Sequence, residues 1–226
     1  MSKYLFRYGF STGKEMHYRI TINGAVDIST PGGDMNNPVK IDMYISQKIV
    51  TCDEGQAVVK VRIENVHADP RMSKEHLPKA GVDSVMQIDA LGNVRWLDGA
   101  AAWQGAEHSM MRFPDHALEP GDSWVQQVED ASGSATPFHT RYRFNGFDRK
   151  NRRLMVFMTE MFSGHPDDRD SQSIGRGTFT FDSEEKWIHD SSNRIVYEYQ
   201  IPVPDNPAMK IITRTTLNID MERLQK

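Results

Sequence analysis

The chain has 226 residues, of which 38% are hydrophobic and 26% are charged, with a formal net charge of -4. We expect a chain of this composition to fold as a soluble globular protein with a substantial core. Its single cysteine, Cys52, excludes an intramolecular disulfide, and its charge balance argues against broad binding to nucleic acid. No apolar run approaches the roughly 18 residues of a membrane-spanning helix.

The chain length favours one large β domain over two small ones, so we predict a single domain over residues 1–226. The first residues lack the apolar core of a secretion signal. We therefore expect a cytoplasmic protein, or an exported or periplasmic one whose signal segment has been removed.

Short segments that alternate apolar and polar residues recur through most of the chain. Met16, Tyr18, Ile20 and Ile22 alternate with polar neighbours, and the same pattern returns over residues 209–221. A period of two is typical of half-buried antiparallel strands. The segments that we predict to be strands are residues 4–10, 15–23, 39–50, 57–66, 84–89, 93–97, 124–128, 138–147, 153–162, 176–182, 186–190, 194–201 and 209–221.

Turn-forming residues separate these segments. Asp53-Glu54-Gly55 predicts a tight hairpin, because Gly55 can take a positive φ. Residues 29–34 have the composition of a loop, and residues 67–81 predict an excursion with little regular structure. Further turns are predicted at residues 91–93, 148–151, 191–193 and 203–207.

The alternation stops between residues 98 and 113. This stretch has helix-forming residues at helical spacing, and Phe113-Pro114 would end a helix there. We predict one short helix, held by Trp103 and by the pair Met110-Met111. The turn Pro120-Gly121-Asp122 then restarts the strands, with Trp124 as the first inward-facing anchor.

These elements predict an all-β fold with one short helix. About ten strands in one sheet would expose long edges unless the sheet curls or closes. We therefore predict a strongly curved antiparallel sheet, in the form of a half-barrel or an open barrel. Residues 154–158 are apolar on both faces, which predicts a central strand or one covered by the helix.

The segment from His165 to Asp170 holds the densest group of possible metal ligands. An imidazole with carboxylates could bind a divalent ion, and His165, Asp167, Asp168 and Asp170 would then serve a metal-dependent hydrolase. The spacing is not that of a calcium loop, so we favour a solvated loop between two strands. We expect no metal and no other cofactor.

Basic residues alternate with aromatic ones over residues 138–144. His139, Arg141 and Arg143 would share one strand face and could contact an anion. The aromatic side chains would face away from the basic side, so we favour a solvated face whose charges prevent edge pairing. Cys52, at a hairpin end without a neighbouring base, predicts packing and not catalysis.

The sequence contains 13 methionines, many of them in predicted strands. Methionine fills irregular space and adapts to varied partners, so a curved sheet lined by it could hold an apolar ligand, with ordinary core packing as the alternative. We expect a pocket near the interruption at residues 98–113. The residues that we expect to bind the ligand are Trp103, Met110, Met111, Trp124, Met155 and Met158.

The stretch from Phe113 to Trp124 ends in Pro120-Gly121-Asp122-Ser123-Trp124 and resembles the "PGDSW" segment of an uncharacterised family of bacterial β-rich domains. Residues 5–10, 89–94 and 175–182 resemble other landmarks of that family, in the same order. The resemblance implies a β-rich domain similar in outline to the curved sheets of lipoprotein carriers. It implies no catalytic residues, and many members of the family are exported or lipid-anchored.

The sequence contains no obvious catalytic set, such as paired carboxylates or a Ser-His-Asp arrangement. We therefore predict a non-catalytic binding or interaction domain, whose concave face holds an apolar, lipid-like molecule. The first alternative is the metal-dependent hydrolase described above. The second is a protein-interaction module that pairs through an exposed strand edge.

Overall fold

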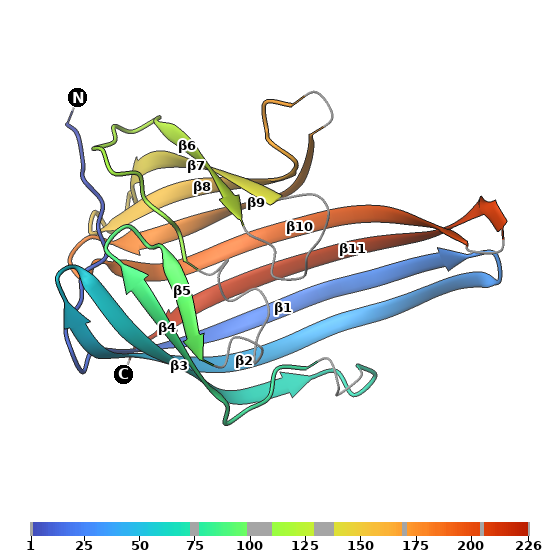
Figure 1. The fold of residues 1–226 in the computed structure, drawn as a ribbon, viewed down its shortest axis with the longest axis horizontal. Helices are drawn as coiled ribbons and strands as arrows, with labels where there is room; N and C mark the ends of the chain where they lie inside the picture. Colours follow the sequence, from blue (N-terminus) through green and yellow to red (C-terminus); the bar gives the residue numbers. More distant parts are fainter. Residues whose placement is uncertain are drawn as a thin grey trace.

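The structure, a computed structural model, describes residues 2–72, 77–98, 110–128, 138–168, 171–203 and 206–225. Within these residues it has eleven β-strands and no helix (Figure 1). The strands are β1 (Glu15–Thr30), β2 (Gly33–Asp53), β3 (Gln56–Ala68), β4 (Asp83–Asp89), β5 (Val94–Asp98), β6 (Ser123–Val128), β7 (Phe138–Phe147), β8 (Leu154–Ser163), β9 (Gln172–Asp182), β10 (Trp187–Val203) and β11 (Asn206–Leu224).

All the strands form one antiparallel sheet, in the order β5-β4-β3-β2-β1-β11-β10-β9-β8-β7-β6. The first and last strands meet at its centre, where Ile20 of β1 lies opposite Met221 of β11. One meander, β1 to β5, runs from this seam to one edge, and a second, β6 to β11, runs from the other edge back to the seam. The sheet curves without closing into a barrel (Figure 1). The prediction of an all-β, curved and open antiparallel sheet is therefore confirmed. Most of the stretch predicted to contain a helix, residues 99–109, lies outside the described residues, and residues 110–113 at its end are not helical.

Four central strands are much longer than the rest. β1, β2, β10 and β11 contain 16, 21, 17 and 19 residues. These four strands continue beyond their shorter neighbours. The pairing of β2 with β3 ends at Ile41 and Ala68, and the pairing of β10 with β9 ends at Ile195 and Gly175. The resulting four-stranded projection, here called the arm, comprises residues 23–40, 196–203 and 206–216 and extends beyond the other strands in Figure 1.

The concave face of the sheet, which carries Met16, Tyr18 and Ile20 of β1, holds the core. Two segments outside the strands, residues 4–10 and 110–118, fill this concavity with aromatic side chains. Phe6, from the first segment, stacks on Phe113 from the second at a centroid distance of 5.4 Å and meets Phe157 of β8 at 5.1 Å. The protein's own side chains therefore fill the end of the concavity that lies away from the arm, and we call this end the closed end.

The prediction of a strand at residues 4–10 is wrong. Phe6 and Tyr8 are buried and Leu5 is exposed, so the alternation is real. However, the segment has only an isolated bridge, between Tyr4 and Leu118, and Tyr8 donates its backbone N–H to Ala90 in a loop. Alternation reports an extended backbone with one buried face, and it does not report whether the neighbour is a strand.

The predicted turn at residues 191–193 is also wrong, because β10 runs through it without interruption. The polar side chains there are satisfied across the sheet. Ser192 donates to Asp220 at 2.6 Å, and the Thr159 hydroxyl donates to Asn193 at 3.0 Å. Cross-strand hydrogen bonds of this kind keep a turn-like sequence in a strand.

The predicted loop at residues 29–34 is much shorter in the structure. β1 continues to Thr30 and β2 begins at Gly33, so only the tip of a hairpin remains. Gly33 has a φ of 131°, a conformation that an L-residue rarely adopts. The turn at residues 53–55 is confirmed, with positive φ values of 45° at Glu54 and 78° at Gly55.

Candidate functional site

The residues predicted to bind an apolar ligand do not surround one cavity among the described residues. Met110, Met111 and Met155 are buried in the core cluster. Trp124 packs against that cluster, stacks on Tyr142 at 5.3 Å and donates its indole N–H to the Arg112 carbonyl at 2.9 Å.

The two remaining candidates lie elsewhere. Met158 is 46% exposed on the convex face of β8, so no helix or segment of the described chain covers the second face of this strand there. β8 is nevertheless an interior strand, between β7 and β9, as the apolar run predicts. Trp103 lies outside the described residues.

The candidate metal loop does not converge on a centre. His165 Nδ1 lies 3.7 Å from an oxygen of Asp167, and the other oxygen of Asp167 forms an ion pair with Arg141 at 3.3 Å. Among the described residues no group of three or more His, Cys, Asp or Glu side chains could hold a metal ion. Asp168 is exposed, and Asp170 lies outside the described residues.

The basic ribbon of β7 lies on the same convex surface. Arg141 is also 3.8 Å from Glu160 of β8, which binds Arg176 of β9 at 3.0 Å. The Arg141 guanidinium lies over the Phe162 ring, 5.2 Å from its centre. Acidic side chains from β8 and from the loop after it therefore compensate Arg141, and cross-strand pairs of opposite charge stabilise a sheet surface.

His139 differs from the sequence-based expectation, because it is buried and not solvated. It is 8% exposed, and its ring lies 5.1 Å from that of His165 in an edge-on arrangement. Its Nδ1 atom has no hydrogen-bond partner among the described residues. The alternation of β7 could not show that a loop from beyond β8 would cover this position.

The segment that suggested a family resemblance has a local structural role. Gly121 has a φ of 106°, and its backbone N–H donates to the Phe144 carbonyl at 2.7 Å. The Asp122 carboxylate accepts the Glu119 backbone N–H at 2.8 Å, as predicted for a turn that bonds its own amides. The turn thereby fixes the start of β6 against β7.

Cys52 is half-buried at the end of β2. Its sulfur lies 3.4 Å from the Thr12 hydroxyl, and its side chain packs against the core cluster. This environment agrees with a packing role for the thiol.

The arm has one face without charge. Pairing across it places Val39, Gly24, Leu217 and Ile195 in one row. The next rows towards the tip join Asn37, Val26, Thr215 and Tyr197, and then Met35, Ile28, Thr213 and Tyr199. These rows continue the concave face of the core, and none of them contains an ionisable acid or base apart from tyrosine.

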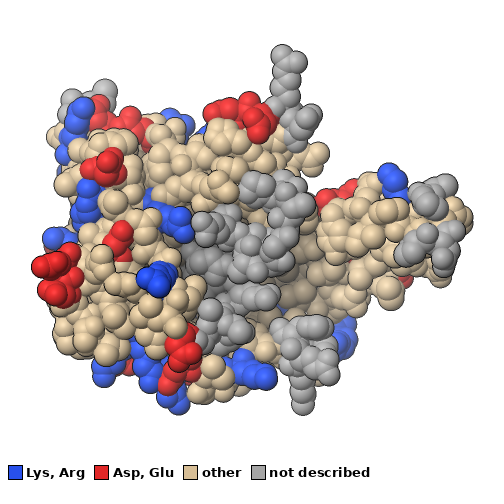
Figure 2. All heavy atoms as spheres, viewed as in Figure 1, with Lys and Arg blue, Asp and Glu red and all other residues tan. Residues whose placement is uncertain are grey.

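Apolar side chains on this face are accessible to solvent. Met35 is 53% exposed, Tyr199 is 40% exposed and Ile201 is 49% exposed. In Figure 2 the arm presents a mostly uncharged surface, with charged side chains at its margins. We call the concave surface formed by β2, β1, β11 and β10 in these rows the arm face.

An aromatic group borders the base of the arm face. The Phe138 ring of β7 meets the Tyr197 ring edge-on at 6.1 Å, and Tyr197 lies 5.8 Å from Tyr199. β7 and β10 are separated by two strands in the sheet order. The contact therefore shows how strongly the sheet curves around the concavity.

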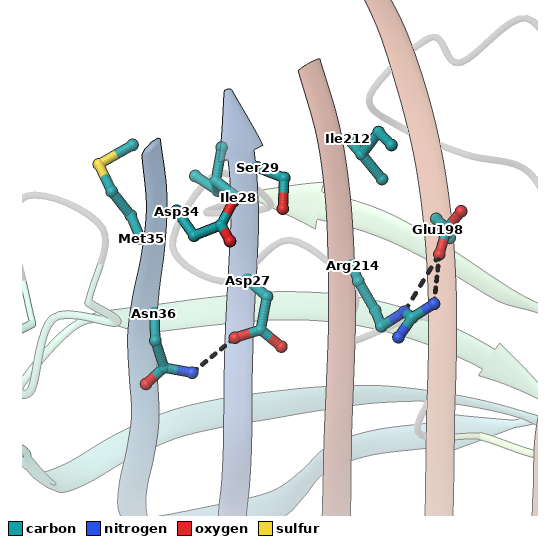
Figure 3. Close-up of a pocket in the computed structure, with 9 residues that line it drawn as sticks. All are labelled: Asp27, Ile28, Ser29, Asp34, Met35, Asn36, Glu198, Ile212 and Arg214. Carbon is teal, nitrogen blue, oxygen red and sulfur yellow. Dashed lines mark hydrogen bonds and ion pairs between the residues drawn. The ribbon is translucent and has the colours of Figure 1, made fainter. Parts of the chain in front are cut away.

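The opposite face of the arm carries charged side chains beside the exposed Val196 and Ile212, and it contains a pocket of about 520 Å³ near the tip (Figure 3). Asn36 donates to Asp27, and Arg214 donates two hydrogen bonds to Glu198, the shorter of them at 2.8 Å. Asn36, Asp27, Arg214 and Glu198 form one row across the four strands. This row is a cross-strand ladder of paired groups, and it lacks a nucleophile with an adjacent base.

Three tyrosines of the core have shifted pKa values. Burial raises the pKa of Tyr8 and of Tyr18, and it raises the pKa of Tyr142 to about 12. All three phenols are therefore neutral at physiological pH. Tyr8 and Tyr18 donate to the Met111 and Ile188 carbonyls, and Tyr142 stacks on Trp124.

The arm face escaped the sequence prediction for two reasons. First, the prediction broke β1 and β2 with a loop at residues 29–34, and it broke β10 with a turn at residues 191–193, so the strands were too short. The alternation Ile195, Tyr197, Tyr199 and Ile201 was visible within a predicted strand. Second, what the sequence could not supply was the pairing of β1 with β11, which joins the four strands into the three rows of the arm face.

Comparison with known proteins adds no family to this description. No family model matches the chain, and no curated protein matches it either. In the described part of the chain, no helix is long and apolar enough to cross a membrane.

Proposed function

We propose that the protein is a non-catalytic binding domain that holds an elongated, uncharged apolar molecule on the arm face. The observation that carries this proposal is the exposure of Met35, Tyr199 and Ile201 on a surface without charged groups. Accessible apolar surface of this kind marks a binding site in many soluble proteins.

The dimensions of the arm face favour a lipid-like ligand. Eight residues of strand span about 27 Å, and the outer two of four strands are about 14 Å apart. An alkyl chain fits such a strip, and each buried methylene contributes about 0.8 kcal/mol. A charged ligand would find no partner in the rows described above.

The closed end of the concavity does not compete for this ligand. Phe6, Tyr8 and Phe113 already occupy it, so the ligand is confined to the arm and to the aromatic group at its base. The resemblance to a family similar in outline to lipoprotein carriers supports the same proposal.

Native mass spectrometry of the purified chain, followed by solvent extraction, tests the proposal. We expect an extractable lipid-like molecule, or saturable binding of a fluorescent fatty acid. Tyr199→Asp places a charge on the arm face and should lower the affinity at least about tenfold, because a buried, unpaired carboxylate is costly.

Val196→Asp is the matched control, because Val196 lies on the same strand, has a similar exposure of 42% and points to the opposite face. Equal loss of binding in the two variants, or no binding by the wild type, would contradict a ligand on the arm face.

A further inference from the structure

The arm has two free edges in the part of the chain that the structure describes. On one side β2 has no strand partner along residues 33–39, because its pairing with β3 ends at Ile41 and the Lys40 carbonyl accepts the Asp69 backbone N–H. On the other side β10 has no neighbour along residues 196–203, because its pairing with β9 ends at Ile195. A free edge presents backbone N–H and C=O groups that can pair with another strand.

The two edges are protected to different degrees. The β2 edge contains Pro38 at its middle, with Asp34 and Lys40 on either side. Proline and charge are the usual means of blocking edge pairing. The β10 edge is rich in β-branched and aromatic residues, carries one charge, Glu198, and has its first proline only at Pro202. The β10 edge is therefore the open one.

Two side chains on the β10 edge have unused hydrogen-bonding groups of opposite kind. Both Arg214 hydrogen bonds reach Oε2 of Glu198, so Oε1 has no partner among the described residues. Lys210 donates to Oε1 of Gln200 at 3.0 Å. The amide oxygen of Gln200 therefore has a partner, whereas its N–H₂ group has none among the described residues. Both side chains lie on the convex face, two residues apart.

We propose that two copies of the chain pair through their β10 edges, antiparallel, about a two-fold axis at Tyr199. In this register Glu198 lies opposite Gln200 of the second copy, and Gln200 lies opposite Glu198. The free amide N–H₂ then donates to the free carboxylate oxygen twice, once on each side of the axis. An axis at Glu198 would instead place two carboxylates opposite each other, which destabilises a pair of strands.

The same register matches the concave side. Tyr199 lies beside Tyr199 of the second copy, and Tyr197 lies opposite Ile201, an aromatic–β-branched pair of the kind that stabilises antiparallel sheets. The two arms would join into one eight-stranded sheet with a continuous arm face. The pairing does not require the proposed ligand, because its hydrogen bonds come from the backbone of the strand edge and from Glu198 and Gln200 on the convex face.

Cross-linking tests the register in the full chain carrying Cys52→Ser. Residues paired across a two-fold axis have Cα atoms about 4.5 or 5.5 Å apart, within the range that a disulfide bridges. We expect Tyr199→Cys to form a disulfide-linked dimer under mild oxidation. Val196→Cys is equally exposed but lies about 20 Å from its copy in this register, so it should remain uncross-linked.

Charge variants at Gln200 test the same contact without cysteine, by sedimentation over a range of concentrations. Gln200→Lys places an ammonium opposite Glu198 of the second copy, and Gln200→Glu places a carboxylate there. We expect dimer dissociation constants that differ by about tenfold, with the lysine variant tighter, because each pair occurs twice.

Within one copy the effect has the opposite sign, since the carboxylate of Gln200→Glu would attract Lys210 and the ammonium of Gln200→Lys would repel it. A general change in stability therefore cannot mimic the expected order. A wild-type chain that stays monomeric up to about 1 mM overturns the proposal. Equal cross-linking of the two cysteine variants, or a tighter dimer for Gln200→Glu, overturns it as well.

Discussion

The Tyr8 hydroxyl donates a buried hydrogen bond of 2.9 Å to the Met111 carbonyl, which links two non-strand segments 103 residues apart in the chain. These segments meet inside the concavity, and the bridge between Tyr4 and Leu118 is the isolated β-pairing that the described residues show for them. The buried Tyr8 hydrogen bond adds to the pair of backbone hydrogen bonds between Tyr4 and Leu118, which join the same two segments.

Replacing this phenol tests the link. We expect Tyr8→Phe to lower the free energy of unfolding by about 1–3 kcal/mol, because the Met111 carbonyl is left buried without its partner. Tyr199→Phe, on the exposed arm face, should change it by less than about 0.5 kcal/mol. Urea unfolding of the two variants would measure both values, and equal effects would contradict the assigned role of the hydrogen bond.

Gly92 is required for two separate reasons. It has a φ of 91°, and a Cβ atom there would meet the Met111 carbonyl oxygen and lie 2.7 Å from the Tyr8 ring. We expect Gly92→Ala to destabilise the protein by at least about 3 kcal/mol, through backbone strain and overpacking together.

Gly81→Ala separates the two contributions. Gly81 has a similar φ of 79°, but an added Cβ would have no neighbour within 4 Å. Its substitution should cost about 1–2 kcal/mol from strain alone. Thermal unfolding of both variants gives the difference, which would vanish if packing at Gly92 were unimportant.

Asp182 makes stability depend on pH. Burial alone would raise the pKa of its carboxyl, but hydrogen bonds from Arg153 and from the Glu184 and Glu185 amides outweigh burial and lower the pKa below the ordinary 3.8. A lowered pKa in the folded state stabilises the protein above about pH 4, and this contribution is lost as the pH falls further.

Asp182→Asn should therefore reduce stability by about 1.5–3 kcal/mol at pH 7, where charge-assisted hydrogen bonds are lost. The deficit should shrink as the pH falls below 4, since the wild type loses the same contribution there. Urea unfolding at several pH values measures this convergence. A deficit that stays constant down to pH 3 would show that the carboxylate charge is not involved.

The edge-on contact between Phe138 and Tyr197 predicts coupling between β7 and the arm. A double-mutant cycle with alanine at both positions should give a coupling free energy of about 0.5–1.5 kcal/mol. The corresponding cycle for Trp124 and Tyr197, which belong to separate aromatic contacts, should give a value near zero. Coupling of similar size in both cycles would point to a general loosening of the sheet.

The alternation of side chains was sufficient to predict the class of fold and most strands. It also located the hairpin at residues 53–55, because Gly55 and the acidic residues before it are local determinants. It failed where a polar sequence is stabilised by other strands, as Asn193 of β10 is by Thr159 of β8, across Gly177 of β9. Such partners come from distant parts of the chain and have no local sequence pattern.

The candidate site was harder to predict for the same reason. Met110, Met111 and Met155 are apolar and adaptable, but the sequence does not tell whether such side chains line a cavity or fill a core. The arm face depends on the register between β1 and β11, which only a long-range pairing can set. The segment from residue 165 to residue 168 was correctly favoured as a loop, and its Asp167 is paired with Arg141.

The seam between β1 and β11 has a consequence for how the chain is made. The meander β1 to β5 leaves the ribosome well before β11, and its β1 edge has no partner until β11 has been made. Contacts of such long sequence separation form slowly. A nascent or truncated chain that lacks β11 would therefore leave β1 and β10 as open strand edges, which can pair with other chains in the cell.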